Sequence, residues 1–257
     1  MTGRLDGRIA LVTGGSRGIG RGIALRLAQE GSAVVAFTYH SNDAAARETA
    51  AQIEAVGASA VAIRARLERT GDIDALFRAL DEKLTALTGD TGLDILVNNA
   101  GSAGTGTLTT TTPDTFDEIV AVNARAPFFV LQQASSRLRE GGRVINISSA
   151  FSTRPSPGAP VYSMAKAAVN ALSTIAAAEL GERGITVNTV SPGWTATDAN
   201  ADARRDERLI ASVARDTAAG RIAEPADIAG VVAMFASAEG AWLTGQYAEA
   251  NGRFRWS

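Results

Sequence analysis

Short apolar runs alternate with longer segments of helical periodicity along the 257 residues of this chain. Runs of about four to eight residues that are apolar throughout predict strands covered on both faces, and the segments between them are long enough for helices. The alternation predicts an α/β fold, a doubly wound and mostly parallel seven-stranded sheet with helices on both faces, which binds ligands at the carboxyl ends of its strands. The expected strands are residues 9–13, 33–38, 60–64, 93–97, 142–148, 186–190 and 246–250.

The composition narrows the classes of function. No linker divides the chain, so we expect a single domain over residues 1–257. Its 25 basic and 27 acidic residues nearly balance, and no arginine cluster alternates with aromatic residues, so we expect no nucleic-acid partner. No signal-peptide pattern or membrane-length apolar stretch is present, and cysteine is absent. We therefore expect a soluble cytoplasmic protein without disulfides, membrane contact or a bound metal.

Tyr162 and Lys166 form the most informative pair, because Lys83 is the only other lysine. Helix formers follow Tyr162, and the prolines and glycine before it indicate a loop, so both side chains should project from one face near a helix N-terminus. A nearby cation lowers the pKa of a phenol from about 10 and makes it usable as an acid or base. The alternative interpretation is an ordinary pair on a helix surface.

A glycine-rich turn, Thr13-Gly14-Gly15-Ser16-Arg17-Gly18-Ile19-Gly20, directly follows the first expected strand. Glycines let the backbone approach a pyrophosphate, whose charge is favoured at a helix N-terminus. The spacing Gly14-x-x-x-Gly18-x-Gly20 is wider than the G-x-G-x-x-G fingerprint. A plain strand-to-helix turn is the alternative explanation of these glycines.

Six motifs in order resemble those of the short-chain dehydrogenase/reductase family, and most closely its bacterial reductases of 3-oxoacyl carrier proteins. The resemblance covers essentially the whole chain and implies a Rossmann-like fold. It also implies hydride transfer between a nicotinamide and a carbonyl or secondary alcohol of a small molecule. The motifs are Thr13-Gly14-x-x-x-Gly18-x-Gly20, Asn98-Asn99-Ala100-Gly101, Asn123, Asn146-Ile147-Ser148-Ser149, Tyr162-x-x-x-Lys166 and Pro192-Gly193.

The resemblance implies a role for each catalytic residue. Tyr162 is the acid or base, and Lys166 holds the nicotinamide ribose and lowers the tyrosine pKa. Ser149 orients the substrate oxygen, with Ser148 as the second choice. Asn123 binds a water in a proton relay or, as a compatible alternative, closes a helix irregularity as a buried amide.

The expected cofactor is NADP(H). Thr38 stands where NAD-dependent members carry the acid that binds the ribose 2′-hydroxyl, so Arg17 can meet a 2′-phosphate instead. His40 is equally well interpreted as a surface loop residue, and Asn99 to Gly101 as structural. The expected cofactor contacts are Gly14, Ser16, Arg17, Gly18, Ile19, Gly20, Thr38, Tyr39, His40, Ser41, Arg66, Leu67, Asn99, Ala100, Gly101, Tyr162, Lys166, Pro192, Gly193, Thr195 and Thr197.

Two departures from the family limit the comparison. Arg66-Leu67 stands where many members have an aspartate that binds adenine. Near the C-terminus, residues 249–254 stand where family members often have Val-Asp-Gly-Gly. This difference affects the geometry of the expected homo-oligomer, which is a tetramer or a dimer. Residues 194–215 match the family's substrate lid, and Trp194 is either a pocket floor or packing.

Three functions remain open. An NADP(H)-dependent reductase or dehydrogenase of small molecules is expected first. A 3-oxoacyl-[acyl-carrier-protein] reductase is the alternative, although Phe129 and Ala178 replace the arginines that meet a carrier; Arg125 and Arg183 lie nearby and could substitute. A non-catalytic dinucleotide sensor is the third, and it predicts damage at Ser149, Tyr162 or Lys166 that the chain does not have.

Overall fold

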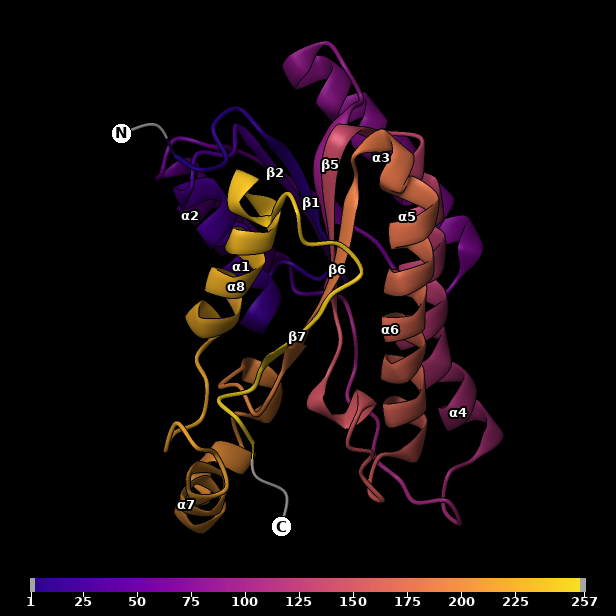
Figure 1. Ribbon diagram of the computed structural model, residues 1–257, viewed down its shortest axis with the longest axis vertical. Helices are drawn as coiled ribbons and strands as arrows, with labels where there is room; N and C mark the ends of the chain where they lie inside the picture. Colours follow the sequence, from indigo (N-terminus) through magenta and orange to yellow (C-terminus); the bar gives the residue numbers. More distant parts are fainter. Residues whose placement is uncertain (1–2, 255–257) are drawn as a thin grey trace.

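A single parallel sheet organises the computed structural model, which describes residues 3–254 (Figure 1). Within these residues seven strands lie in the order β3-β2-β1-β4-β5-β6-β7, and all neighbouring pairs are parallel. The predicted fold class is confirmed. The strands are β1 (Ile9–Val12), β2 (Val34–Tyr39), β3 (Ser59–Arg64), β4 (Leu93–Asn98), β5 (Leu138–Ile147), β6 (Thr186–Pro192) and β7 (Tyr247–Ala250).

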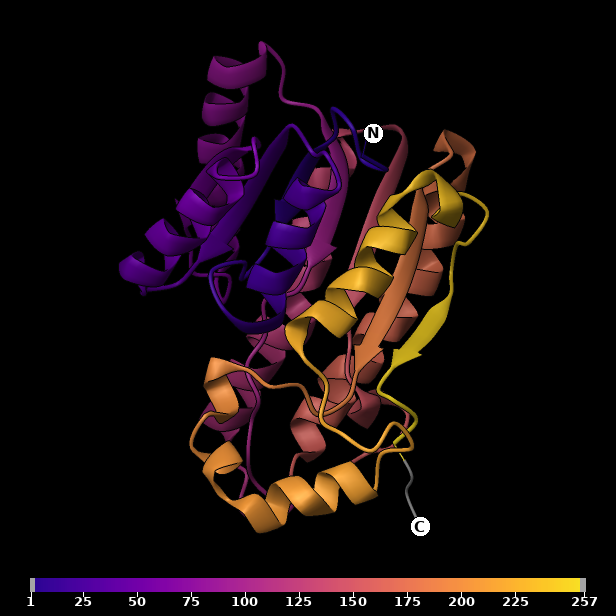
Figure 2. The same cartoon turned by 90° about the vertical axis from the view of Figure 1, so that its left-hand side faces the viewer.

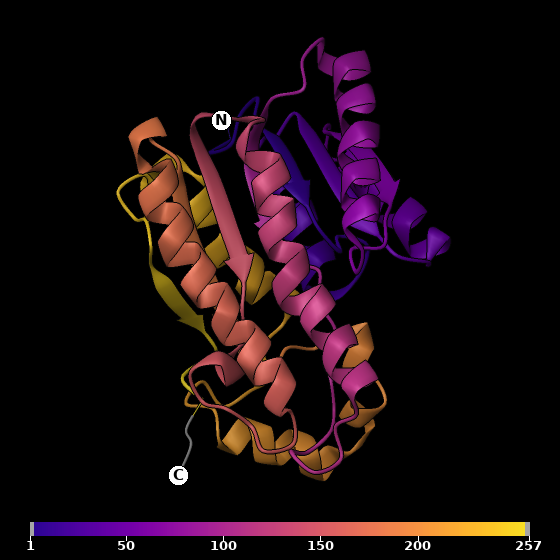
Figure 3. The same ribbon diagram turned by 90° about the vertical axis from the view of Figure 1, so that its right-hand side faces the viewer.

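Helices cover both faces of this sheet (Figures 1 and 3). One face carries α1 (Gly18–Gln29), α2 (Asp43–Glu54) and α8 (Pro225–Ala236), and the other carries α3 (Thr70–Thr88), α5 (Ala126–Ser135) and α6 (Pro160–Leu180), with α4 (Pro113–Val120) packed beside α6. Short helical turns complete the chain: the π-helical η1 (Ala121–Arg125) and the 3₁₀ turns η2 (Ala150–Ser152), η3 (Gly181–Arg183), η4 (Asp198–Asn200), η5 (Ala203–Arg205) and η6 (Ala238–Gly240).

The sequence of β1 is apolar at every position because this central strand contributes to two cores. In β1, Ile9 and Leu11 pack in the layer beneath α3, α5 and α6, whereas Ala10 and Val12 pack beneath α1, α2 and α8. Successive side chains of a strand point to opposite faces, so a strand covered on both sides needs apolar residues at every position. This explains why the chain shows continuous apolar runs rather than alternating ones.

The strand order creates one switch point in the sheet. β1 lies between β2 and β4, and the chain leaves these central strands toward opposite faces, through α1 on one side and α4 on the other. Ligands of doubly wound sheets bind at such a switch point, outside the carboxyl ends of the strands. After β6, residues 193–224 cross this edge through η4, η5 and α7 (Glu207–Arg215), as Figure 2 shows. No helix within residues 3–254 is long and apolar enough to cross a membrane.

β5 begins earlier than the expected Gly142, at Leu138. Leu138 pairs with Leu93, and the register with β4 shifts before Ile95 pairs with Arg143. Gly141 adopts a φ of 71°, which lets the strand bend and resume its pairing. The glycine pair that indicated a strand boundary is therefore an irregularity inside the strand.

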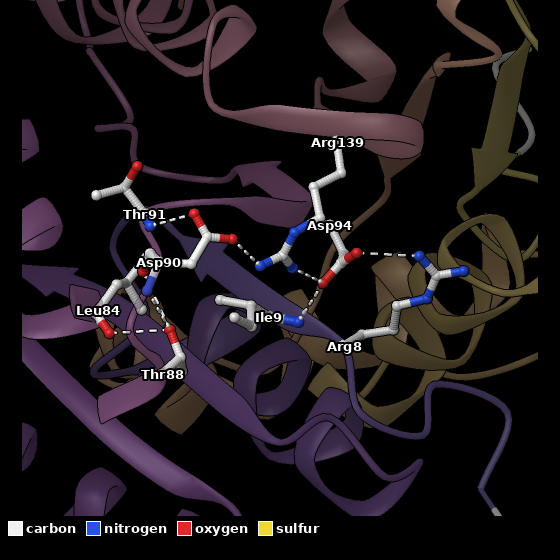
Figure 4. A network of polar contacts seen from close by, with 8 residues as sticks. All are labelled: Arg8, Ile9, Leu84, Thr88, Asp90, Thr91, Asp94 and Arg139. Carbon is white, nitrogen blue, oxygen red and sulfur yellow. Dashed lines mark hydrogen bonds and ion pairs between the residues drawn. The ribbon is translucent and has the colours of Figure 1, made fainter. Parts of the chain in front are cut away.

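A buried carboxylate ties the amino ends of the central strands together (Figure 4). Asp94 of β4 accepts a hydrogen bond from the Ile9 backbone N–H at 2.8 Å, and its two oxygens also accept from Arg8 at 3.0 Å and Arg139 at 2.8 Å. Only 7% of the Asp94 side chain is exposed, whereas both arginines are more than a third exposed. The bond to Ile9 is therefore the best protected of the three, and it links β1 to β4.

Replacing this carboxylate should destabilise the fold without affecting the opposite edge of the sheet. We expect Asp94→Asn to lower the free energy of unfolding by about 2 kcal/mol, since the amide keeps only one acceptor oxygen, turns an NH2 group toward a donor and removes the charge that faces Arg8 and Arg139. Urea denaturation at 25 °C measures the change. Asp90→Asn is the matched control, because it removes only the exposed bond to Arg139 at 2.6 Å and should cost less. Equal losses in the two variants would contradict this account.

Candidate active site

A cavity of about 850 Å³ opens at the carboxyl ends of the strands. It extends from the β1–α1 loop to the start of α6, and a hollow of about 530 Å³ adjoins it beside the ends of β2 and β3. Most residues expected from the sequence line this cavity. They are Gly14, Ser16, Arg17, Gly18, Ile19, Gly20, Thr38, Tyr39, His40, Arg66, Leu67, Asn99, Ala100, Gly101, Ser149, Tyr162, Lys166, Pro192, Gly193 and Thr197.

The glycine loop forms a cradle that side chains would fill. Gly14 and Gly18 adopt φ values of 65° and 53°, a region that favours glycine. A Cβ on Gly20 would lie 2.2 Å from the Gly14 carbonyl oxygen, so the backbone can approach a ligand only because the side chains are absent. Thr38 supports the loop, since its hydroxyl accepts the Gly14 N–H at 2.9 Å. The loop meets the N-terminus of α1, and this fits the pyrophosphate of a dinucleotide.

The polar residues after β4 hold this loop in place. The Asn99 side-chain amide donates to the carbonyls of Thr13 and Gly14, at 2.9 and 3.2 Å. The Thr13 hydroxyl accepts the backbone N–H groups of Asn99 and Ala100, each at 2.9 Å. These contacts join the ends of β1 and β4, and they support the structural interpretation of Asn99.

Tyr162 and Lys166 lie in the first two turns of α6, which begins at Pro160 as the preceding loop predicts. The Lys166 side chain is buried, and its Nζ donates to the Ile147 carbonyl of β5 at 2.9 Å. Nζ lies 5.8 Å from the centre of the Tyr162 ring. An ammonium has three donors, so Lys166 keeps donors for the cavity that it lines.

The two serines after β5 have different surroundings. The Ser148 hydroxyl donates to the Lys166 carbonyl at 3.1 Å and is buried, which locks α6 onto β5. Ser149 precedes η2, and its hydroxyl accepts the Phe151 N–H at 3.2 Å while it lies near the Tyr162 hydroxyl. Ser149 is therefore the serine whose hydroxyl proton is free of an internal carbonyl acceptor, and this supports the choice of Ser149.

Burial controls both titratable groups of the pair. Burial lowers the pKa of Lys166 from 10.5 to about 8. Burial also raises the pKa of Tyr162, and the neighbouring Ser149 hydroxyl offsets part of that rise. The expected lowering of the tyrosine pKa by Lys166 does not occur in this structure, because desolvation of the phenol outweighs the other effects. Tyr162 therefore keeps its proton at neutral pH, as a proton donor must.

Asn123 does not line the cavity, and it lies fully buried in η1 between α4 and α5. Its amide donates to the carbonyls of Ile119 at 2.9 Å and Ser102 at 3.0 Å, and its oxygen accepts the Ser102 N–H at 3.3 Å. A Cβ on Gly101 would lie 2.8 Å from Asn123 Oδ1 and 3.3 Å from Lys166 Nζ. Asn123 thus closes a π-helical irregularity close to the lysine, and the relay role stays a prediction.

Two expected cofactor contacts also fall outside the cavity lining. Ser41 is exposed beyond the end of β2. Thr195 is buried, its hydroxyl donates to the Gly193 carbonyl at 3.1 Å, and its backbone bridges to Ala223. Thr197 lines the cavity and packs against Gly18, whereas Trp194 does not line it.

Sequence reasoning missed several lining residues. Asp198 and Ala199 fall in the expected lid, and Ala65, Glu68 and Arg69 adjoin the expected Arg66-Leu67, so position along the chain could have indicated these five. Of the others, Ile147 belongs to the Asn146-Ile147-Ser148-Ser149 motif and Ser102 follows the Asn98-Asn99-Ala100-Gly101 motif, whereas no motif indicates the rest. The rest are Asp72, Ala103, Glu118 and Val122. Within residues 3–254 no group of three or more His, Asp or Glu side chains could hold a metal ion.

Comparisons with known proteins agree with this geometry. The family model described as "Enoyl-(Acyl carrier protein) reductase" matches residues 14–252. A versicolorin reductase of Emericella nidulans is 36% identical over 260 residues, which cover 97% of this chain and 96% of the relative.

Two solved structures extend this likeness over nearly the whole fold. The angucycline C-6 ketoreductase LanV with bound NADP is 43% identical, with a TM-score of 0.93 and coverage of 98% of this chain and 97% of LanV; LanV was also solved with NADP and rabelomycin. A short-chain dehydrogenase/reductase of Serratia marcescens is 36% identical, with a TM-score of 0.90 and coverage of 98% and 100%. The chain belongs to the short-chain dehydrogenase/reductase family.

Proposed function

We propose that this protein is an NADP(H)-dependent ketoreductase, which reduces a ketone of a small molecule to a secondary alcohol. The observation that carries the proposal is the placement of Ser149, Tyr162 and Lys166 at one end of the cavity whose middle is the glycine cradle. A dinucleotide with its pyrophosphate on that cradle fits the cavity, with its two ends toward α6 and toward β2 and β3. LanV, which binds NADP, supports the choice of cofactor.

Each residue of the site has a defined task in this reaction. The reduced nicotinamide supplies the hydride that the carbonyl carbon gains. Ser149 donates a hydrogen bond to the carbonyl oxygen and orients it toward the phenol. Tyr162 delivers its proton to that oxygen, so the carbonyl carbon gains a hydride and its oxygen a proton. Lys166 holds the nicotinamide ribose and offers a positive charge beside the phenolate that remains.

The substrate is a polycyclic aromatic ketone or a related polyketide. Relatives carry the names of ketoreductases of this kind, namely the angucycline ketoreductase solved with rabelomycin and the versicolorin reductase. The wall beside Tyr162 fits such a substrate, because Ser102, Ala103 and Gly193 leave room for a broad ring system.

The carrier-protein alternative finds less support. Phe129 and Ala178 carry no charge, and the two nearby arginines are already engaged within the chain. Arg125 donates to the Glu68 carbonyl at 2.7 Å, and Arg183 bonds to Glu140 and to the carbonyls of helix α5 and strand β5. Neither is free to attract an acidic carrier.

The non-catalytic sensor also finds less support. Such a protein could bind a dinucleotide without an acid, a base or an orienting hydroxyl. Here Ser149, Tyr162 and Lys166 are all present beside one another at the cavity. Their joint presence favours an enzyme.

The assembly and the lid are further parts of this proposal. The chain forms a single domain, and residues 194–215 act as a substrate lid, since Thr197 and Asp198 line the cavity and α7 lies beyond it.

The enzyme is cytoplasmic, where NADPH is supplied, and forms a dimer or tetramer. Exposed apolar side chains on α5 and α6, Phe128, Met164 and Ile175, favour burial against a second copy. Light scattering in solution tests the assembly.

Removing the Tyr162 hydroxyl should abolish turnover and spare cofactor binding. We expect Tyr162→Phe to lower kcat by about 10²–10⁴-fold, because general acid catalysis supplies that factor, and to leave the Kd for NADPH nearly unchanged. Steady-state kinetics and fluorescence titration measure the two quantities. Tyr247→Phe is the control; it removes a phenol that bonds to Ser191 at 2.8 Å outside the cavity lining and should retain most activity. A Tyr162→Phe enzyme with more than about a tenth of the wild-type kcat would contradict the assignment.

The pH dependence should report the buried lysine. Lys166 is charged below its pKa of about 8 and loses its charge as the pH rises through that value, while the raised pKa of Tyr162 keeps the phenol protonated. We therefore expect kcat/KM for ketone reduction to fall above about pH 8, since this ratio follows the free enzyme. Lys166→Arg should lower the activity and abolish the fall of kcat/KM above about pH 8, because a guanidinium does not titrate in that range. A wild-type profile that is flat up to pH 10 would overturn the explanation.

The cofactor preference should depend on Arg17. Its side chain lines the cavity, is exposed, and has no intramolecular partner within residues 3–254. We expect the wild type to prefer NADPH, and Arg17→Ala to lower kcat/KM for NADPH about tenfold or more while it leaves NADH use nearly unchanged, because only the 2′-phosphate loses a charged hydrogen bond. Equal or better wild-type use of NADH would refute the preference.

A further inference from the structure

The end of the cavity away from Tyr162 lacks the residue expected to recognise an adenine. This inference rests on the proposed function, because it takes NADP(H) as the ligand. With the pyrophosphate on the glycine cradle and the nicotinamide beside Tyr162, the adenosine lies toward the ends of β2 and β3. There, Arg66 lies two residues after the end of β3 and lines both the main cavity and the adjoining hollow.

A guanidinium cannot replace an acid at this position. The exocyclic amino group of adenine donates hydrogen bonds, so its partner must be an acceptor. Arginine carries donors only. Arg66 can face the ring or a phosphate, but the amino group must find its acceptor elsewhere in the cavity wall.

Four carboxylates line the cavity, Glu68, Asp72, Glu118 and Asp198, and the first two lie in the segment that connects β3 to α3 and in the start of α3. One oxygen of the Glu68 carboxylate is buried without a hydrogen-bond partner, so only its other oxygen can face a ligand. Asp72 lies in the first turn of α3, is partly buried, and lines both the main cavity and the adjoining hollow. Its carboxylate has no hydrogen bond or ion pair within the described part of the chain.

The adjoining hollow presents apolar and charged groups together. Ile63, Ala75, Leu76 and Ala79 of β3 and α3 share its wall with His40, Arg64, Arg66 and Asp72. Asp72 lies at the border that this hollow shares with the main cavity. A purine placed over such a wall would bring the edge with its amino group toward an acceptor at the border.

We propose that Asp72 accepts a hydrogen bond from the amino group of the adenine and so replaces the missing acid after β3. The acceptor has moved from the end of a strand to the first turn of the next helix. Arg66 is thereby left for the phosphate or the ring face. Asp72 is thus a specificity residue for the purine rather than only a helix-terminal charge.

A cofactor analogue tests this directly. NADPH and its hypoxanthine analogue differ at C6, where a carbonyl oxygen replaces the amino group, and at N1, which carries a proton only in hypoxanthine. We expect the wild type to bind NADPH about tenfold or more tightly than the analogue, because a carboxylate bonds to an amino group and repels a carbonyl oxygen. Asp72→Asn should reduce this ratio to about threefold or less, since an amide can donate to the oxygen. Equilibrium titration by nucleotide fluorescence gives each Kd without turnover.

Asp114→Asn is the matched control. Asp114 is also an acid in the first turn of a helix, α4, but it does not line the cavity. The control should keep the wild-type ratio of the two dissociation constants. Equal wild-type affinity for both nucleotides, or an unchanged ratio in Asp72→Asn, would overturn this inference while leaving the proposed function intact. A wild type that binds neither nucleotide would overturn both.

Discussion

Burial of the sheet on both faces is the constraint on which the rest of this structure depends. Because α1, α2 and α8 cover one face and α3, α5 and α6 the other, the central strands β1, β2 and β4 have no solvent-exposed face for polar side chains. A ligand can reach these strands only at their ends. At the carboxyl ends the β1–α1 loop, the start of α6 and the segment after β6 converge on one cavity. The fold therefore determines where a site can form before any catalytic residue is considered.

The junction of β5 and α6 turns that location into a reactive site. Ser148 bonds to the Lys166 carbonyl, and Lys166 Nζ bonds to the Ile147 carbonyl, so the first turns of α6 are fixed to the end of β5 from both sides. The same contacts hold Tyr162 next to Ser149. Burial lowers the pKa of the lysine and raises that of the tyrosine, so the phenol stays protonated at neutral pH. The hydrogen bonds that fix α6 to β5 therefore also position the residues of the site.

Much of this could be predicted from the sequence, because apolar runs, glycine turns and the spacing of Tyr162 and Lys166 are local signals. The parallel sheet follows from the βαβ alternation, and most of the expected residues that line the cavity follow from motifs beside strand ends. The misses are non-local. The bend at Gly141 depends on pairing with β4, Thr195 is turned inward by its bridge to Ala223, and Asp72 reaches the cavity only because α3 begins beside β2 and β3. No local pattern encodes such placements.

The two edges of the sheet differ in how completely their polar groups are satisfied. At the amino edge, Asp94 uses both oxygens on Ile9, Arg8 and Arg139, so its charge is neutralised within the chain. At the carboxyl ends of the strands, the side chains of Arg17 and Asp72 make no hydrogen bond or ion pair within the described residues. These two charges are therefore available to a ligand in the cavity. The polar residues at the amino ends of the strands therefore stabilise the fold, and those at the carboxyl ends are available for ligand recognition. Because the two groups of residues are separate, one sheet can provide both.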